Sequence, residues 1–494
     1  MARFPLPLYC SMLMACCLLA GCAASLGPGY VVEKQEIRVN FSPGDDHSAV
    51  IITADYRLKN TGNQDLPAMQ VRMPGRRFRA NTPQAHWDDA ELTGTAAPDN
   101  ARDTLYRLPS VWKIGEAHVL RFSYEMQGEP ANRESAGISP DAFYLRAEGW
   151  APQLPQARGL FGFGGVPPAK WELVVSVPRD FAIHASGSNK KKSGSLKNQN
   201  TEYRFTQTAK DLNPFVVAGR YRETTQQLPD NQTVHVWSRS QLDEAQLRQS
   251  GESLARTLSS YEKLFGRRGK SRSPLWIVEC PVVSGCVAQT QTSYSALLYG
   301  REQPRAAEMI SLDSVLVDSR QAGSSLEAAA GPALAEGWLG YGQNPGFYEL
   351  QPPMTALPAF ATAMAREGTE GEGIREEIMR RAVAAIPENA GQDSKAGPSV
   401  ARAKSLLFFY ALRERAGDEA FQKALQHMLY ARQSRGFNIT DLIAALEEES
   451  HQSVGPFVRE WIKRPGLPQE FRRRYASAAV SSSWQESSSE RRTQ

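Results

Sequence analysis

Apolar and polar residues alternate along most of the first half of the chain. From about Tyr30 to Tyr221, Gly, Pro, Asn and Asp separate segments of this kind, a pattern typical of half-buried antiparallel strands. The segments are EIRVNF, AVIITADYRLKN, HVLRFSYEM, KWELVVSV, EYRFTQT and FVVAGRY. They predict a β-sandwich. The basic stretch from Lys190 to Lys192 falls between two of these segments, and we interpret it as a solvated hairpin tip rather than a basic binding groove.

From about Thr233 the pattern changes to an alternation of strand and helix. VHVW, PLWIVE and EMISL read as strands, whereas apolar residues from Leu242 to Phe265 have helical spacing. This alternation is typical of an α/β region. From about Asp313 onward the spacing predicts mostly helices, over residues 313–320, 325–341, 353–367, 371–385, 399–416, 418–433, 439–449 and 453–463.

The first 22 residues have the pattern of an export signal. A single Arg precedes an apolar run that is too short to span a bilayer, and small residues follow it. Leu19-Ala20-Gly21-Cys22 resembles the bacterial lipobox. This resemblance implies that Cys22 is acylated and becomes the first residue of the mature protein. Ala23 and Ala24 do not resemble an inner-membrane retention signal, so we expect a lipid anchor in the outer membrane, facing the periplasm. The alternative is an ordinary secretory leader that contains a Cys.

Composition narrows the classes of function. Hydrophobic residues make up 41% and charged residues 22% of the 494 residues, which is ordinary for a globular protein. A net charge of +4 is too balanced to indicate nucleic acid as a partner. Beyond the first 22 residues the only cysteines are Cys280 and Cys286. In an exported protein they predict a local disulfide, the alternative being two buried thiols.

The order of these regions resembles the alanyl aminopeptidase family of gluzincin metallopeptidases. FYLRAEGWAPQLPQARG, KWELVVSVPRDFAIHASG and PFVVAGRY are similar to the end of the β-domain of that family. VHVWSRSQLDEAQLRQSGESLARTLSSYEKLFGRR is similar to the first strand and helix of its catalytic domain, and KSLLFFYALRERAGDEAFQKALQHMLYARQSRGFNITDLIAALEEESHQSVGPFVREWIKRPGLP to its closing helices.

The resemblance implies a multidomain α+β protein. It would have an N-terminal antiparallel β-sandwich, a thermolysin-like α/β domain of the catalytic type, and C-terminal helices. The predicted boundaries are a signal peptide over 1–21, a linker over 22–29, the β-domain over 30–225, a degenerate peptidase domain over 226–385, its helical end over 386–470, and a low-complexity disordered tail over 471–494.

The residues at the catalytic positions of the family have been replaced. In the family, a helix with His-Glu-x-x-His supplies two zinc ligands and a general base, and a later Glu is the third ligand. Leu334-Ala335-Glu336-Gly337-Trp338-Leu339-Gly340-Tyr341 is similar to the third-ligand pattern, and it makes Glu336, Trp338 and Tyr341 a vestigial cleft. Counting from it places Asp313, Ser314 and Val317 on the His-Glu-x-x-His motif and Arg402 on the oxyanion Tyr.

A second alignment remains open. Trp338 and Gly340 also match the Gln-Trp-x-Gly that often follows the zinc helix. The ligand and base positions are then Pro332, Ala333 and Glu336, and the third ligand is Thr355. Pro332 predicts that the helix carrying Glu336 begins near it or is kinked there.

The seven histidines decide the metal question without any alignment. No two of them are closer than His427 and His451, which are 24 residues apart, so no helix can present two imidazoles one turn apart. We therefore predict no catalytic residue, no bound metal and no cofactor, and hence an inactive homologue that binds a peptide or a protein partner. Two alternatives are an active hydrolase with a non-standard site and a purely structural component of the cell envelope.

Overall fold

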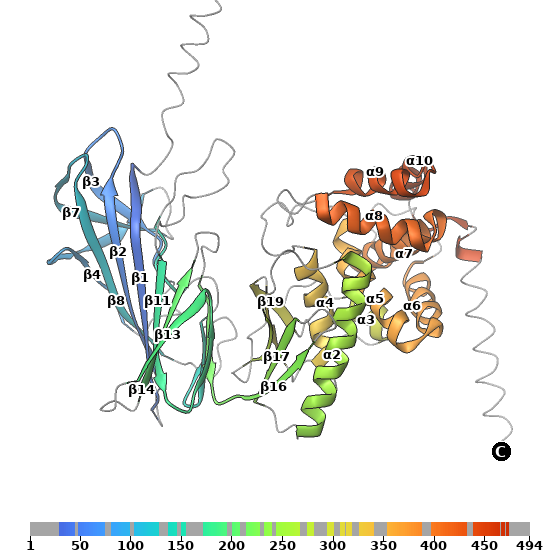
Figure 1. The fold of residues 1–494 in the computed structure, drawn as a ribbon. Coiled ribbons are helices and arrows are strands. Elements are labelled where there is room, and N and C mark those ends of the chain that lie inside the picture. The colour runs from blue at the N-terminus through green and yellow to red at the C-terminus, as the bar shows by residue number, and fades with distance from the viewer. Residues whose placement is uncertain are drawn as a thin grey trace, which may run out of the picture. The chain divides into compact units, whose positions relative to one another are not determined.

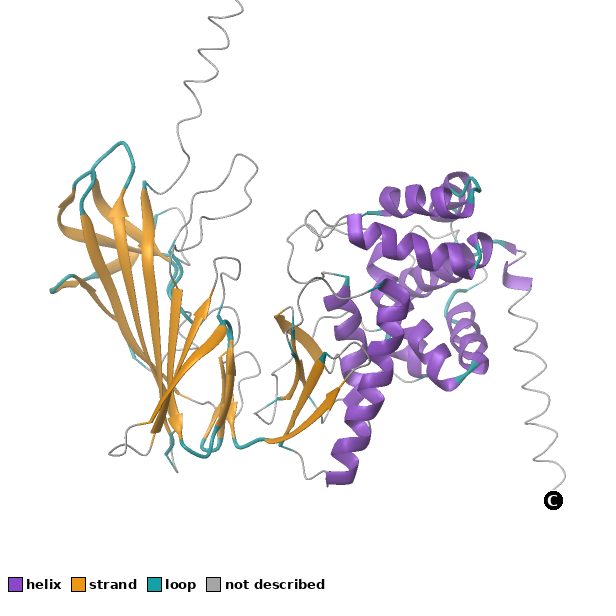
Figure 2. Ribbon diagram, viewed as in Figure 1, coloured by secondary structure: helices purple, strands orange, loops and turns teal. Residues whose placement is uncertain are grey.

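The computed structural model describes residues 29–44, 48–74, 81–98, 103–127, 137–145, 150–154, 171–194, 200–207, 214–227, 232–239, 244–266, 274–280, 294–300, 307–311, 313–318, 326–339, 353–387, 397–431, 438–464, 466–469 and 471–473. The chain divides into two compact units, with the boundary between Arg220 and Tyr221. Unit 1 consists of strands and unit 2 of a sheet with helices (Figure 1, Figure 2).

Within its described residues, unit 1 contains three sheets. The largest has the strand order β13-β14-β11-β1-β2-β8-β4-β5, a second has the order β12-β15-β10-β9, and a third has the order β3-β7-β6. The strands are β1 (Tyr30–Ser42), β2 (Ala49–Asn60), β3 (Leu66–Val71), β4 (Gln84–Trp87), β5 (Ala90–Leu92), β6 (Gly94–Ala96), β7 (Thr104–Trp112), β8 (Ala117–Gln127), β9 (Gly137–Ser139), β10 (Ala142–Leu145), β11 (Trp171–Pro178), β12 (Ala182–Ala185), β13 (Ser188–Gly194), β14 (Asn200–Gln207) and β15 (Val216–Gly219).

Alternation along the strands produces the core of unit 1. In β2, the side chains of Ile52, Ala54, Tyr56 and Leu58 are buried, and those between them are exposed or half-buried. They pack with buried residues from the other two sheets, so that one apolar layer lies between sheets, as in a sandwich. The strands pair antiparallel except for β1 with β11, which are parallel. This confirms the predicted β-rich N-terminal fold.

The interpretation of Lys190 to Lys192 as a hairpin tip is wrong. These residues belong to β13, which pairs antiparallel with β14 at the edge of the largest sheet. Lysines are common on edge strands, because their charges oppose pairing of the exposed edge with another chain.

Unit 2 contains a five-stranded sheet in the order β16-β17-β18-β20-β19. Its strands are β16 (Arg222–Gln227), β17 (Thr233–Ser238), β18 (Leu275–Glu279), β19 (Ala307–Ser311) and β20 (Ser314–Val317). β17, β18 and β20 run parallel, and the two outer strands pair antiparallel with their neighbours. Within unit 2, the helices lie on one side of this sheet (Figure 2).

The helices of unit 2 follow one another along most of its second half. They are α2 (Glu244–Phe265), α3 (Ser295–Tyr299), α4 (Leu326–Trp338), the 3-10 helix η3 (Met354–Ala356), α5 (Leu357–Glu370), α6 (Glu372–Ala384), α7 (Pro398–Ala416), α8 (Asp418–Ala431), α9 (Ile439–Ser450) and α10 (Gly455–Lys463). The predicted helices from residue 325 onward are confirmed to within a few residues at their ends. Among the described residues, no helix is both long enough and apolar enough to cross a membrane.

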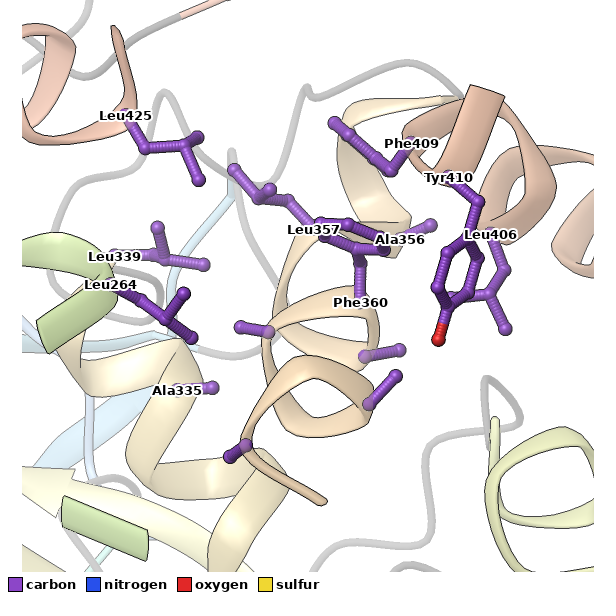
Figure 3. Packing of buried hydrophobic residues seen from close by; sticks show 14 of the residues in the cluster. Leu264, Ala335, Leu339, Ala356, Leu357, Phe360, Leu406, Phe409, Tyr410 and Leu425 are labelled. Atoms are coloured by element: carbon purple, nitrogen blue, oxygen red, sulfur yellow. The ribbon is translucent and has the colours of Figure 1, made fainter. Parts of the chain in front are cut away.

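Buried apolar side chains join these helices. Figure 3 shows Leu264 of α2 beside Ala335 of α4 and beside Leu339, which directly follows α4. Phe360 of α5 lies nearby. The Phe360 ring stacks on that of Phe409 of α7 with their centroids 5.4 Å apart, and it meets the ring of Tyr410 on the same helix edge-to-face at 5.0 Å. This packing fixes α5 between α4 and α7.

A nearly buried ion pair adds to this packing. Arg413 of α7 donates to Glu367 of α5 at 2.7 Å, and both side chains are close to nine-tenths buried. Tyr410 donates to the other oxygen of the same carboxylate at 2.8 Å, and Arg413 also donates to Asp418 at the start of α8. Because each partner is satisfied by further hydrogen bonds, the group links three helices without leaving a charge unpaired.

Candidate functional site

The segment that was aligned first with the zinc motif is a strand. Ser314–Val317 forms β20, so the predicted helix over 313–320 is wrong. The run Val315-Leu316-Val317 is apolar and completely buried, and such a short run has no periodicity that distinguishes a buried strand from a helix. In extended backbone, the two ligand positions Asp313 and Val317 are about 13 Å apart, whereas one helical turn would bring them to within about 6 Å, so this segment cannot direct both side chains at one ion.

Helix α4 carries the residues of the second alignment. It is the next described element after β20, and it contains Pro332, Ala333 and Glu336. The helix continues through Pro332, which has no N–H for the carbonyl of residue 328. Ala333 is buried, and Glu336 is half-buried.

Tyr261 of α2 holds α4 beside α5. Its completely buried hydroxyl donates to the carbonyl of Gly331, one residue before Pro332, at 2.9 Å. It also bonds to the hydroxyl of Thr362 on α5 at 3.1 Å. Burial raises the pKa of Tyr261 far above its ordinary value, so the hydroxyl keeps its proton at any physiological pH.

The residues that follow Glu336 have packing roles. A Cβ atom on Gly337 would lie 2.5 Å from Cε of Met309 of β19, so a larger residue here would displace the flexible end of that side chain. The indole of Trp338 donates to the carbonyl of Gly266 at 3.0 Å, and its ring lies 6.1 Å from that of Tyr261. Both residues therefore take part in the packing of α4 against its neighbours. Tyr341, the other member of the predicted vestigial cleft, lies outside the described residues.

Three polar side chains from separate elements meet near the start of α5. Tyr294, immediately before α3, is hydrogen-bonded through its side chain to Thr355 of η3, and the positive charge of Arg402 on α7 acts on it. Burial raises the pKa of Tyr294 to about 12, while the bond to Thr355 and the Arg402 charge oppose the rise. Tyr294 is thus a neutral hydroxyl beside a guanidinium group at neutral pH.

This cluster joins residues from both alignments. Thr355 was the third-ligand position of the second alignment, and Arg402 was the oxyanion position of the first. Tyr294 was missed, although a signal was present: it ends SGCVAQTQTSY, which stands roughly where the family has Gly-x-Met-Glu-Asn. No motif gave Tyr261 a role either, because its importance depends on contacts with helices 70 and 101 residues away.

The donor set around α4 does not suit zinc. Zn²⁺ is held by three or four N, S or O donors, and structural or catalytic sites usually include imidazole or thiolate. Proline and alanine have no donor, and threonine offers only a neutral hydroxyl, so Glu336 is the single strong ligand. In the part of the chain that the structure describes, no three His, Cys, Asp or Glu side chains are grouped so that they could hold a metal ion.

The histidines of unit 2 are engaged elsewhere. The His235 ring stacks on Trp276 of β18 at 4.1 Å, and its Nδ1 lies 2.5 Å from a carboxylate oxygen of Glu223. His427 on α8 is 43% exposed beside Glu448 and Glu449. His451 follows α9 in the left-handed conformation.

Cys280 lies directly after β18 and is buried, and its backbone N–H donates to the carbonyl of Val317 at 2.7 Å. Cys286 lies outside the described residues, so its pairing with Cys280 stays a prediction. Cys22 lies outside them as well.

Comparison with solved structures identifies the fold. The chain is similar to an M1 zinc metallopeptidase from Deinococcus radiodurans, with a TM-score of 0.53 and 16% identity over 89% of this chain and 95% of that one. A glutamate-to-alanine variant of that enzyme bound to a Tyr-Ser-Ala substrate gives 0.52 at 18% identity, covering 89% and 96%. The two-domain variant bound to L-arginine gives 0.52 at 17%, covering 89% and 95%. No family model matches the sequence, and no curated protein matches it.

Both units are covered by these alignments, so the multidomain α+β architecture is that of the M1 zinc metallopeptidases. At 16–18% identity the likeness establishes the fold and leaves the chemistry to the side chains present.

Replacing Tyr261 by Phe tests the link between α4 and α5. The change removes a hydroxyl that serves two buried polar groups, so we expect the free energy of unfolding to fall by about 1–3 kcal/mol. Urea unfolding followed by helical circular dichroism measures it, because the described helices all lie in unit 2. Tyr430→Phe is the control, since Tyr430 is 79% exposed, and it should change stability by less than about 0.5 kcal/mol. Equal losses in both variants would contradict the proposed link.

Proposed function

We propose that this protein is a non-catalytic homologue of the M1 zinc metallopeptidases that binds a peptide or a protein partner outside the cell. The observation that carries the proposal is the content of α4: where a metallopeptidase of this fold needs two imidazoles and a general base, α4 has Pro332, Ala333 and Glu336. The other polar side chains of the candidate site lie outside α4: Tyr294 precedes α3, Thr355 is in η3 and Arg402 is in α7.

Two observations favour α4 as the counterpart of the zinc helix. The alternative segment is the strand β20, which cannot place two ligands one helical turn apart. In addition, Trp338 ends α4 at the place where Gln-Trp-x-Gly follows the zinc helix in the resembled family. In this alignment Thr355 occupies the position of the third ligand.

Loss of these groups removes the means of activating water. A metallopeptidase lowers the pKa of a zinc-bound water and transfers its proton to a carboxylate. Here the carboxylate position is Ala333, which can accept no proton. Glu336 remains, but a single carboxylate without imidazole neighbours is a weak Zn²⁺ site.

The groups that remain are suited to recognition. Tyr294 and Thr355 offer neutral hydroxyls that can donate or accept, and Arg402 provides a guanidinium whose planar donors match carboxylate and carbonyl oxygens. Peptide backbone and a peptide carboxylate present such acceptors. A peptide or an exposed segment of a protein is therefore the ligand class that this chemistry fits.

The lipobox-like Leu19-Ala20-Gly21-Cys22 supports an anchored location. We place the mature protein at the outer membrane, facing the periplasm, and held by the acyl chains on Cys22. More than one chain is needed, because a single acyl chain binds membranes only marginally.

Rebuilding the metal site on α4 tests the assignment. The parent chain should not cleave aminoacyl arylamides. The variant Pro332→His/Ala333→Glu/Glu336→His/Thr355→Glu places both imidazoles one turn apart, and we expect it to bind about one zinc ion per chain in elemental analysis. Circular dichroism of the variant establishes that the fold is retained.

The matched control installs the same residue types on the other segment, as Asp313→His/Ser314→Glu/Val317→His with Glu336 unchanged. It should bind no stoichiometric zinc, because strand geometry separates the two imidazoles. Zinc in the control and none in the folded α4 variant would reverse the assignment. Chelator-sensitive cleavage by the parent chain would end the proposal of a non-catalytic protein.

Labelling with radioactive or clickable palmitate tests the anchor. We expect the parent chain to incorporate label and to sediment with membranes, and Cys22→Ala to lose both properties because the thiol that forms the thioether is gone. Cys280→Ala should keep the label, since Cys280 is buried beside β20. Label retained in Cys22→Ala would show that the lipid is attached to another residue.

A further inference from the structure

The end of unit 1 at which β1 begins carries exposed apolar side chains. Val111 is 50% exposed, Ile114 is 52% exposed and Val31 is 36% exposed. Val111 and Ile114 flank the buried Trp112 at the connection from β7 to β8, and Val31 is the second residue of β1. Large apolar side chains exposed this far normally mark a contact surface when they lie together.

Hydrogen bonds place these residues at one end of the sheet. The carbonyl of Gly29, just before β1, accepts from the backbone N–H groups of Thr61 and Gly62 at 3.0 and 2.6 Å. Asn60 donates through its backbone N–H to Glu116 at 3.0 Å, and its side-chain amide donates to the carbonyl of Trp112 at 3.0 Å. The Tyr30 ring lies 5.7 Å from that of Trp112. The chain therefore enters β1 beside the turn formed by residues 113–116.

The backbone donors of this turn are satisfied within the protein. The N–H of Lys113 donates to the Glu116 carboxylate at 3.0 Å, and that of Ile114 donates to the Asp65 carboxylate at 3.1 Å. The N–H groups of Gly115 and Glu116 donate to the carbonyls of Asn60 and Lys113 at 2.8 and 3.2 Å. Backbone groups that are already paired lose nothing when water is replaced by a less polar medium.

Two lysines of this end of the sheet are exposed beside the apolar side chains. Lys113 lies between Val111 and Ile114, and Lys59 is the pairing partner of Val31. The carboxylates of Asp65 and Glu116 keep their negative charges but each accepts a backbone N–H of the turn. Lysines next to exposed apolar residues can extend their ammonium groups to lipid phosphates, so this combination suits the headgroup region of a phospholipid bilayer.

The covalent position of the anchor selects the occupant of this surface. Cys22 precedes Gly29 by seven residues, which reach at most about 25 Å when fully extended. Ile51, an equally apolar exposed residue of β2, lies nine residues from Asn60 on the same strand, about 30 Å further along it. An anchor on Cys22 therefore brings the turn, and not the opposite end of the sheet, to the membrane.

We propose that Val111 and Ile114, with Lys113 between them, insert into the headgroup region of a phospholipid bilayer. The inference rests on the lipid anchor of the proposed function. The anchor supplies attachment, and the turn supplies a second, fixed contact that orients unit 1 with the start of β1 toward the membrane.

An environment-sensitive NBD fluorophore on Ile114→Cys in the acylated full chain tests this. After reconstitution into phosphatidylethanolamine–phosphatidylglycerol vesicles, we expect the emission to be blue-shifted relative to emission in detergent-free buffer. Vesicles that contain doxyl lipid should quench it several-fold more strongly than vesicles without doxyl lipid. Ile51→Cys carries the same probe at the far end of β2 and should show neither change. The chain without an added cysteine, labelled in parallel, corrects for the native thiols.

The outcomes separate the two proposals. Vesicle-bound protein with equal quenching at positions 114 and 51 would overturn the insertion of the turn and leave the anchor intact. Protein that carries no acyl group and stays in solution would instead contradict the anchor. A Val111→Ser/Ile114→Ser variant that remains acylated should lose the quenching of a probe placed at Lys113→Cys, whereas Ile51→Ser should retain it.

Discussion

The position of α4 between the five-stranded sheet and α5 decides which side chains of unit 2 could act together. Three contacts fix it: Gly337 against Met309 of β19, the Tyr261 hydroxyl on the carbonyl of Gly331, and Trp338 on Gly266. None of these contacts involves a metal ligand or a titrating catalytic group. The helix can therefore keep its place whatever side chains stand at Pro332, Ala333 and Glu336, the positions that we propose as counterparts of the imidazoles and the base of an M1 metallopeptidase. The position of α4 does not depend on the residues at its aligned site positions, because packing contacts alone hold the helix in place.

Much of the fold could be predicted from the chain, because period-2 alternation and helical spacing both reflect burial of one face. β2 and α8 follow these rules closely, with Ile52, Ala54 and Tyr56 inward in the first and Phe421, Ala424, Leu425 and Met428 inward in the second. Spacing gives no such signal at Val315 to Val317, where both faces of the strand are buried and the apolar run has no period. Composition is misleading at Lys190 to Lys192, where the polar run predicts a hairpin tip but pairing with β14 makes it a strand.

Only some residues of the candidate site could be predicted from the sequence. Thr355 and Arg402 were found by counting from a motif, and the structure brings both to Tyr294. Tyr294 and Tyr261 depend on contacts between residues far apart in the chain, which spacing cannot reveal. Of the two alignments, only the one that relied on Trp338 fits the helical geometry of α4, because helix position, rather than the count of matched letters, determines whether two side chains can reach one ion.

Elemental analysis of the purified mature protein tests the central claim most directly. Metal content is measured after purification without chelator and again after equilibration with excess zinc followed by buffer exchange. We expect less than stoichiometric zinc in both preparations, because among Pro332, Ala333, Glu336 and Thr355 only Glu336 is a strong ligand. One zinc ion per folded chain that is lost in Glu336→Ala would contradict it, since other donors would then converge on this helix.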